Sequence, residues 1–108
     1  MIELIVKNLK EVEGNKEEIT NIINEKKEFF DNLFKKYDKN LTFEVIFDHS
    51  SSVYKITSSI DLKSKKILLV EENKDVLKAL TSLMSKFKKA VKKQYELEKK
   101  EHEYKRKR

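Results

Sequence analysis

Apolar residues recur along this chain in blocks, and their spacing changes from one block to the next. Residues 2–7 are mostly apolar and rich in β-branched side chains, which predicts a strand. After the only glycine, Gly14, Asn15 and Glu18 stand at the spacing of a capping box and predict the start of a helix that ends near residues 38–40. Its apolar residues recur three or four apart and predict one buried face: Ile19, Ile22, Ile23, Phe29, Phe30, Leu33, Phe34 and Tyr37.

Three shorter blocks follow, in which apolar and polar residues alternate. This alternation over residues 41–47 and 54–62 predicts two strands that each bury one face, and residues 67–70 predict a third. Polar turns separate them at His49–Ser52 and Lys63–Lys66. Because the connections are short, we expect the three strands to form an antiparallel meander.

From about Asp75 the spacing of apolar residues becomes helical again. No glycine or proline follows before the chain ends, so we expect one long helix. Its inward face is predicted to carry Val76, Leu77, Leu80, Leu83, Met84, Phe87, Val91 and Tyr95. The order strand, helix, three strands, helix predicts an α+β fold, in which two helices pack on one face of a four-stranded sheet. At 108 residues the chain has the size of a single domain.

Positive charge is concentrated at the end of the chain. Residues 86–108 hold eleven Lys or Arg and four Glu, whereas residues 1–85 hold fourteen Lys and fifteen Asp or Glu. Packing gains nothing from this segregation, because like charges repel, so it indicates an acidic partner: nucleic acid, an anionic membrane surface or an acidic protein. The alternative is a solvated helix with a frayed end.

The spacing of the lysines favours nucleic acid. At 100° per residue, Lys86, Lys89, Lys93 and Lys100 fall within about 60° of one another and away from the apolar stripe, which predicts a basic ridge. A second ridge, formed by Lys88, Lys92 and Lys99, is predicted on the other flank of that stripe. Cations at regular intervals on a rigid rod suit a phosphate backbone, which they would contact without reading base sequence. A membrane surface or a helical protein partner would require bulky apolar residues that are scarce beyond Val91.

The sequence offers little support for catalysis. His49 lies among serines and His102 in the charged end, without the partners that a metal site or a general base needs. One glycine cannot build a phosphate-binding loop, and the absence of cysteine rules out disulfides and thiolate metal sites. The phenylalanines at positions 29, 30 and 34 keep the helical period and favour core packing. We therefore expect no enzyme, no cofactor, no metal and no small-molecule substrate.

The opening residues carry an acid and too short an apolar run for a signal peptide, and no segment approaches the roughly 20 apolar residues that span a bilayer. We therefore expect a cytoplasmic protein that does not associate with membranes. We further expect it to be monomeric when free.

The sequence resembles the family of ribosome hibernation-promoting factors and ribosome-associated translation inhibitors. The resemblance is carried by Asp75-Val-Leu-Lys-Ala-Leu80, then by Leu83, Lys86, Phe87, Lys89, Val91 and Lys93, and by the opening strand, Tyr37-Asp38 and the order of elements. It implies a β-α-β-β-β-α fold related to double-stranded RNA-binding domains. It also implies a short family member, with a ribosome-binding domain over residues 1–104 and a basic tail over residues 105–108.

The resemblance implies binding to the small ribosomal subunit and its rRNA near the decoding centre. There the protein would block the mRNA and tRNA sites and inhibit translation in idle ribosomes, as part of a stress or stationary-phase response. It implies an RNA-binding role for Lys86, Lys89 and Lys93, with Lys100 beside them and Lys88 and Lys92 on the second ridge, and a structural role for Asp75. The alternative is a general module that binds structured RNA or a protein through the basic helix.

Overall fold

The protein is an α+β domain with the predicted order of elements. The computed structural model describes the backbone of residues 2–106 and the side chains of residues 2–100. Its elements are β1 (Ile2–Lys7), a short 3-10 helix η1 (Leu9–Glu11), α1 (Lys16–Leu33), β2 (Leu41–Ser50), β3 (Val53–Asp61), β4 (Lys66–Asn73) and α2 (Val76–Arg106). The predicted basic tail begins inside α2, and Lys107 and Arg108 lie outside the described residues.

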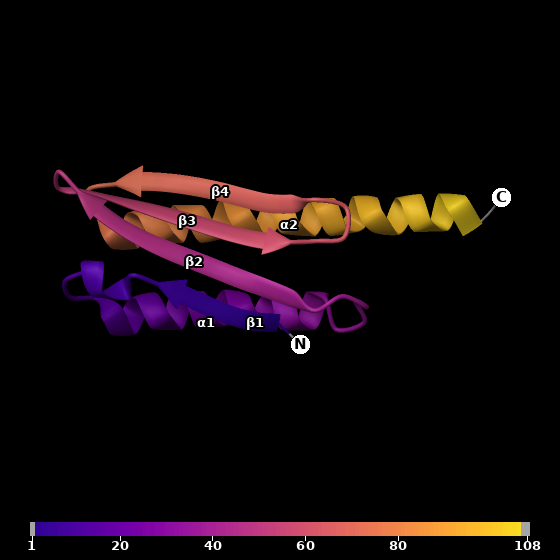
Figure 1. The fold of residues 1–108 in the computed structure, drawn as a ribbon, viewed down its shortest axis with the longest axis horizontal. Coiled ribbons are helices and arrows are strands. Elements are labelled where there is room, and N and C mark those ends of the chain that lie inside the picture. Colours follow the sequence, from indigo (N-terminus) through magenta and orange to yellow (C-terminus); the bar gives the residue numbers. More distant parts are fainter. Residues whose placement is uncertain (1, 107–108) are drawn as a thin grey trace.

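The four strands form one mixed sheet in the order β1-β2-β3-β4 (Figure 1). β2, β3 and β4 pair antiparallel, so the predicted meander is confirmed. β1 pairs parallel with β2, which the intervening helix α1 makes possible because the chain must cross back before it re-enters the sheet. Consequently β1 and β4 are the two edges of the sheet.

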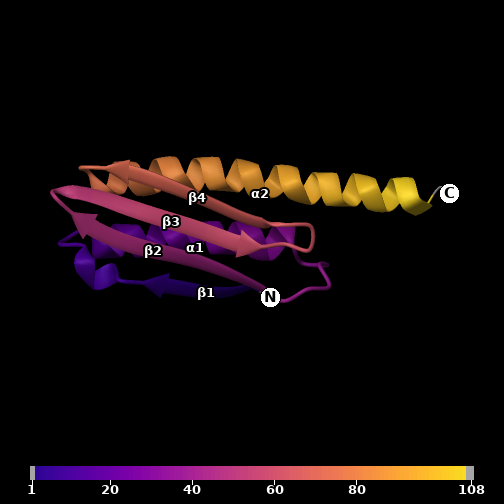
Figure 2. The ribbon, with the colours of Figure 1, turned by 45° about the horizontal axis from the view of Figure 1, so that its top comes forward.

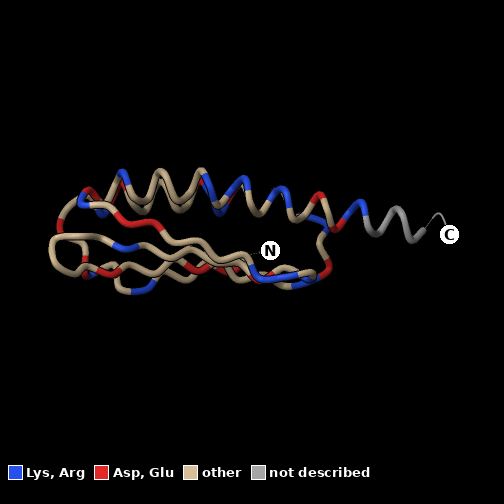
Figure 3. Tube along the Cα trace, turned by 90° about the horizontal axis from the view of Figure 1, so that it is seen from above, with Lys and Arg blue, Asp and Glu red and all other residues tan. Residues whose placement is uncertain are grey.

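Both helices lie on the same face of the sheet, as predicted. α1 runs behind β1 and β2, and α2 runs behind β3 and β4 in the same direction as α1 (Figures 1 and 2). Seen from above, the helices form one layer and the strands the other (Figure 3). The second face of the sheet carries no helix, and α2 continues well past the end of the sheet (Figure 1).

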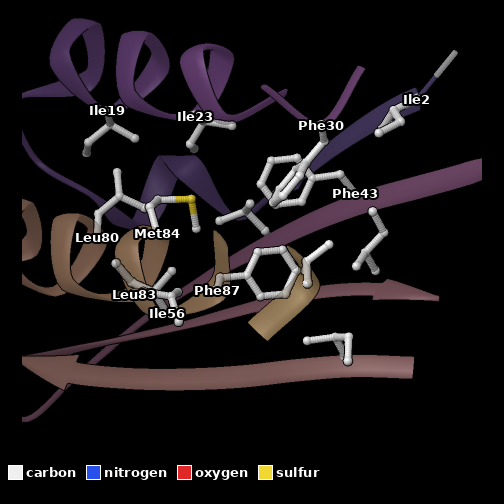
Figure 4. Packing of buried hydrophobic residues seen from close by; sticks show 14 of the residues in the cluster. Ile2, Ile19, Ile23, Phe30, Phe43, Ile56, Leu80, Leu83, Met84 and Phe87 are labelled. Atoms are coloured by element: carbon white, nitrogen blue, oxygen red, sulfur yellow. The ribbon is translucent and has the colours of Figure 1, made fainter. Parts of the chain in front are cut away.

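The hydrophobic core fills the space between the sheet and the helices (Figure 4). At its centre Phe30 of α1 meets Phe43 of β2 edge to face, with ring centroids 5.3 Å apart, and meets Phe87 of α2 at 5.7 Å. Phe43 and Phe87 stack with their centroids 5.6 Å apart. One aromatic cluster therefore ties both helices to the sheet, and Phe30 belongs to the core, as its spacing predicted. Val12 and Ala79, which the periodicity did not single out, are buried as well.

The two long helices begin differently from each other. Asn15 precedes α1 as predicted, but its backbone is left-handed with φ 56° and its side chain accepts no capping hydrogen bond. The expected capping box between Asn15 and Glu18 is therefore absent, because the side chain of an N-cap residue reaches the helix only from extended backbone. α2 does have a cap: Oδ1 of Asp75 accepts hydrogen bonds from the amides of Leu77 at 3.0 Å and Lys78 at 3.3 Å. The structural role expected for Asp75 is confirmed.

The turn between β2 and β3 is shorter than predicted. β2 continues to Ser50, and only Ser51 and Ser52 make the turn, with φ of 52° and 66°. Two left-handed residues match the twist of a two-residue hairpin, so the strands can pair up to the turn itself. His49 is consequently a strand residue, and its ring stacks on Tyr54 across the hairpin with centroids 4.1 Å apart. β4 also extends beyond its apolar block, through residue 73.

Candidate nucleic-acid interface

The second half of α2 carries most of the positive charge on the helix. Seven lysines and two glutamates lie between residues 86 and 100, whereas residues 76–85 contain one lysine and no acid. Figure 3 shows the basic residues following one another along this part of α2. Because Phe87 and Val91 are fully buried on the inward side of the same segment, its lysines are forced onto the remaining surface.

Three of these lysines form an outward ridge, which comprises Lys89, Lys93 and Lys100. All three are exposed, and the helical period sets them opposite Phe87 and Val91. Within residues 2–100, where side chains are described, none of the three ammonium groups lies within ion-pair distance of a carboxylate. Their charge is thus available to an external anion.

Lys86, predicted to share this ridge, is engaged differently. Its Nζ lies 3.1 Å from Oε1 of Glu71 on β4, where it forms an ion pair and a hydrogen bond. Glu71 belongs to the part of β4 that lies beyond the predicted strand, so sequence spacing gave no sign of this partner. Lys86 therefore bridges α2 and the sheet edge, and its charge is partly matched within the protein.

The second predicted ridge lies on the flank of α2 that faces α1. The Nζ atom of Lys88 sits 4.4 Å from the ring centroid of Phe29 on α1, and that of Lys99 sits 4.5 Å from the ring of Tyr95. Lys92, between them, is exposed. A cation over an aromatic face keeps its charge while its position is restrained. Lys88, Lys92 and Lys99 form a flank strip, in which Lys88 and Lys99 lie over aromatic rings and Lys92 is exposed to solvent.

One lysine of α1, Lys27, is occupied within the fold. Lys27 forms an ion pair with Asp31 at 2.8 Å, and Asp31 also accepts a hydrogen bond from the amide of Ile2 at 2.9 Å. Burial would raise the pKa of Asp31, but these two hydrogen bonds and the charge of Lys27 outweigh it and hold the pKa below 3.8. Lys27 is thus occupied within the fold, whereas Lys35 and Lys36, just after α1, are exposed.

A polar cluster that the sequence did not reveal holds the second half of α2 in place. The hydroxyl of Tyr37 donates a hydrogen bond of 2.5 Å to Oε1 of Glu98 and accepts one of 2.8 Å from the amide of Lys63. The amide and hydroxyl of Ser64 both donate to Oε2 of Glu98, and Gln94 donates to the Ser64 hydroxyl at 2.8 Å. We call this group, Tyr37, Lys63, Ser64, Gln94 and Glu98, the polar latch.

The latch shifts the pKa of both its acidic groups. Burial would raise the pKa of Glu98, but the hydrogen bonds from Ser64 and Tyr37 outweigh it and leave the pKa below 4.5. Burial raises the pKa of Tyr37 to about 12, and the hydrogen bond to Glu98 contributes in the same direction. At neutral pH the carboxylate is thus ionised and the phenol protonated, which is the pairing that the hydrogen bond needs.

The residues that could suggest catalysis do not come together. His49 stacks on Tyr54 in the hairpin, and the side chain of His102 lies outside those described. Among the described residues no group of three or more His, Asp or Glu side chains is placed to hold a metal ion. Among the described helices, none has the length and apolar character needed to cross a membrane.

No protein-family model matches the sequence, and no curated protein matches it. Solved structures do match. The Thermus thermophilus Protein Y N-terminal domain has a TM-score of 0.59 at 17% identity, over 85% of this chain and 96% of that one. A ribosomal subunit interface protein from Coxiella burnetii has a TM-score of 0.53 at 17% identity, over 87% of this chain and 96% of that one. Both are proteins of the hibernation-promoting factor family that the sequence resembles. At this identity the likeness establishes the fold, and this chain has the fold of the Protein Y N-terminal domain.

Proposed function

We propose that this protein binds the small ribosomal subunit near the decoding centre through the second half of α2, and so blocks the mRNA and tRNA sites of idle ribosomes. The observation that carries the proposal is the outward ridge: Lys89, Lys93 and Lys100 are exposed and have no carboxylate partner among the described side chains. The fold shared with a solved ribosomal subunit interface protein supports the same partner.

The geometry of the ridge suits rRNA phosphates. A helix rises about 1.5 Å per residue, so Lys89 and Lys93 stand roughly 6 Å apart along its axis, with Lys100 about 10 Å further on. Lysine presents a compact charge that meets a phosphate without the paired hydrogen bonds by which arginine reads a base edge. The interaction would thus recognise the shape and charge of folded RNA, and its strength would come from released counterions.

The other lysines would contribute to different degrees. Lys88 and Lys92, on the flank strip, would meet a second stretch of the RNA backbone. For Lys88 the loss of side-chain entropy would be small, because its side chain is already held over Phe29. Lys86 would contribute less, because an rRNA phosphate must compete with Glu71 for its ammonium group. The order of importance is therefore the outward ridge, then the flank strip, then Lys86.

The protruding end of α2 fits a site between RNA walls. The helix passes the end of the sheet as a single rod (Figure 1), and the polar latch fixes it where it leaves the core. Of the outward ridge, Lys100 lies on this rod beyond the latch, whereas Lys89 and Lys93 precede it on the part of α2 that packs on the sheet. The proposal places the protein in the cytoplasm under stress or in stationary phase, as a binder without catalytic activity.

Co-sedimentation with ribosomes tests this proposal. Purified ribosomes would be run on sucrose gradients with the wild type and with a variant carrying Lys89→Glu, Lys93→Glu and Lys100→Glu. A matched control carries Lys10→Glu, Lys16→Glu and Lys74→Glu, three exposed lysines that lie outside α2, and has the same net charge as the variant. We expect the wild type and the control to migrate with small subunits and whole ribosomes, and the ridge variant to stay at the top.

Other outcomes would redirect or reject the proposal. Equal loss of binding in the ridge variant and its control would mean that net charge matters and the ridge does not. A folded wild type that stays at the top of the gradient at low salt would reject the ribosome as partner. If that protein still binds free double-stranded RNA, with an affinity that falls steeply with salt, the chain is a general binder of structured RNA.

A further inference from the structure

The two edges of the sheet are protected to very different degrees. β1 has six residues, and its first amide, that of Ile2, is occupied by Asp31 of α1. β4 has eight residues and pairs only with β3, so every second backbone amide and carbonyl along it points away from the sheet. Within the described residues no backbone or side-chain group hydrogen-bonds to that outer edge. An open edge of this length is a template for another strand.

The side chains of β4 do not protect this edge from pairing with another strand. Leu68 is 51% exposed and Val70 is 44% exposed, and they are two of the three large apolar residues that are exposed in the described part of the chain. Both lie on the face of the sheet that carries no helix, because they alternate with Ile67 and Leu69, which pack toward the core. No proline interrupts the strand, and charges stand only toward its ends.

The sequence of β4 is complementary to itself when read in the opposite direction. In an antiparallel pair centred on Leu69, Leu68 of one copy stands opposite Val70 of the other, and Lys66 stands opposite Glu72. Moving the centre by one residue in either direction would place Leu68 opposite Glu72, or Lys66 opposite Val70. Moving the centre by half a residue would pair residues from the helix-covered face of one copy with residues from the uncovered face of the other. On the face without helices only the centre at Leu69 matches both the apolar and the charged pairs; on the helix side it places Ile67 opposite Glu71, whose carboxylate is paired with Lys86.

We propose that two copies of this chain associate through their β4 edges about a two-fold axis at Leu69, so that their sheets become continuous. The contact is isologous, so each apolar and each charged pair occurs twice. On the helix side, Lys86 lies next to the proposed contact, and its charge is already matched by Glu71. This ion pair limits the repulsion between the Lys86 side chains of the two copies. This assembly replaces the expectation of a free monomer, and it is independent of the proposed function because the outward ridge stays exposed in it.

Analytical ultracentrifugation of the full chain over a wide range of concentrations tests the association. The mass of the wild type should rise from one chain to two and no further, because each chain has a single open β4 edge. Val70→Lys should abolish the rise, because it places a lysine opposite Leu68 in both halves of the contact. The matched control is Thr42→Lys, an exposed position on β2 on the same face of the sheet. The control should dimerise like the wild type, and both variants should keep the thermal melt of a folded protein.

Reversing the charges at positions 66 and 72 tests the register of the proposed strand pairing. Lys66→Glu and Glu72→Lys should each raise the dimer dissociation constant about tenfold, because each turns two attractive pairs into two repulsive ones. An equimolar mixture of the two variants should recover the affinity, since opposite charges then face each other across the contact. A wild type that keeps the mass of one chain at every concentration would overturn the proposal. So would a mixture no tighter than its components, or a Thr42→Lys variant that loses association as Val70→Lys does.

Discussion

The two halves of α2 are alike on the inside and different on the outside. Residues 76–85 and residues 86–100 both present buried apolar residues to the sheet, such as Leu80 in the first half and Phe87 in the second. On the outward side the first half carries one lysine, Lys78, beside Ser82 and Ser85, whereas the second carries a row of lysines. Packing constrains only the inward positions, so a binding function would depend on the outward residues in which the two halves differ.

The halves also differ in how they are held. The first half rests on the hydrophobic core, in which Leu80 and Leu83 are fully buried. Beyond Val91 the apolar contacts thin out to the half-buried Tyr95, and the polar latch around Glu98 takes over. Beyond Val91 the proposed RNA-binding segment is therefore attached mainly by directional hydrogen bonds, which fix the direction of the rod but contribute less stability than the core.

The largest effect should come from the core of the first half. Leu80→Ala removes a fully buried side chain and should lower the free energy of unfolding by about 2–5 kcal/mol. Tyr95→Ala in the second half should cost clearly less, because Tyr95 is only half-buried. Urea denaturation of both variants checks this, with Leu97→Ala as an exposed control within about 0.5 kcal/mol of the wild type. Equal losses at positions 80 and 95 would show that the core extends further along α2 than we describe.

An intermediate effect should come from the latch. Tyr37→Phe removes the hydrogen bonds to Glu98 and from the Lys63 amide, and should cost about 1–2 kcal/mol. Hydrogen exchange should speed up at residues 92–100 and remain unchanged at residues 76–85. The matched control is Tyr54→Phe, because no hydrogen bond of the Tyr54 hydroxyl occurs among the described residues. Faster exchange along the whole helix would mean that α2 opens as one unit.

The same latch should make stability depend on pH at both extremes. The pKa of Glu98 lies below 4.5 in the folded state, so its contribution is present above pH 4.5 and is lost as pH falls through the folded value. The pKa of Tyr37 is raised from 10.0 to about 12, so its contribution is present below pH 10 and is lost as pH rises toward 12. Thermal melts of Glu98→Gln across pH should show a smaller acidic loss than the wild type, with the part due to Asp31 retained because its pKa is also lowered. Matching acidic losses in the two proteins would exclude Glu98 as its source.

The sequence predicted the fold well and the surroundings of the lysines poorly. Periodicity found the strands, which depend on alternate residues, and the inward stripe of α2, which depends on neighbours three or four positions away, such as Leu80 and Met84. It could not show that Lys86 meets Glu71, fifteen residues earlier, or that Lys88 covers Phe29. Such contacts depend on how the elements pack against one another, and this packing cannot be predicted from the spacing of residues within one helix.

The latch was missed for a similar reason. Glu98 falls on the inward side of α2, in line with the apolar stripe, where its charge looks misplaced from the sequence alone. Its partners come from the loop after α1 and from the turn before β4, so only the assembled fold gives it a role. A charged residue that continues an apolar stripe is the one signal that could have indicated it.

The smallest effect on stability, and the sharpest test of the comparison, should come from giving the first half of α2 the surface of the second. Ser82→Lys together with Ser85→Lys would extend the outward ridge toward the start of the helix, while Ser82→Gln with Ser85→Gln matches the length of the added side chains more closely than serine does and adds no charge. Neither pair should change the free energy of unfolding by more than about 0.5 kcal/mol per position, because these side chains contribute nothing to the core.

If the phosphate backbone follows the helix past Lys89, the lysine pair alone should steepen the slope of the logarithm of ribosome affinity against the logarithm of salt concentration by roughly one to two. An unchanged slope would mean that the contact does not continue from Lys89 toward the start of the helix, so that the boundary between the two halves of α2 is also the boundary of the interface.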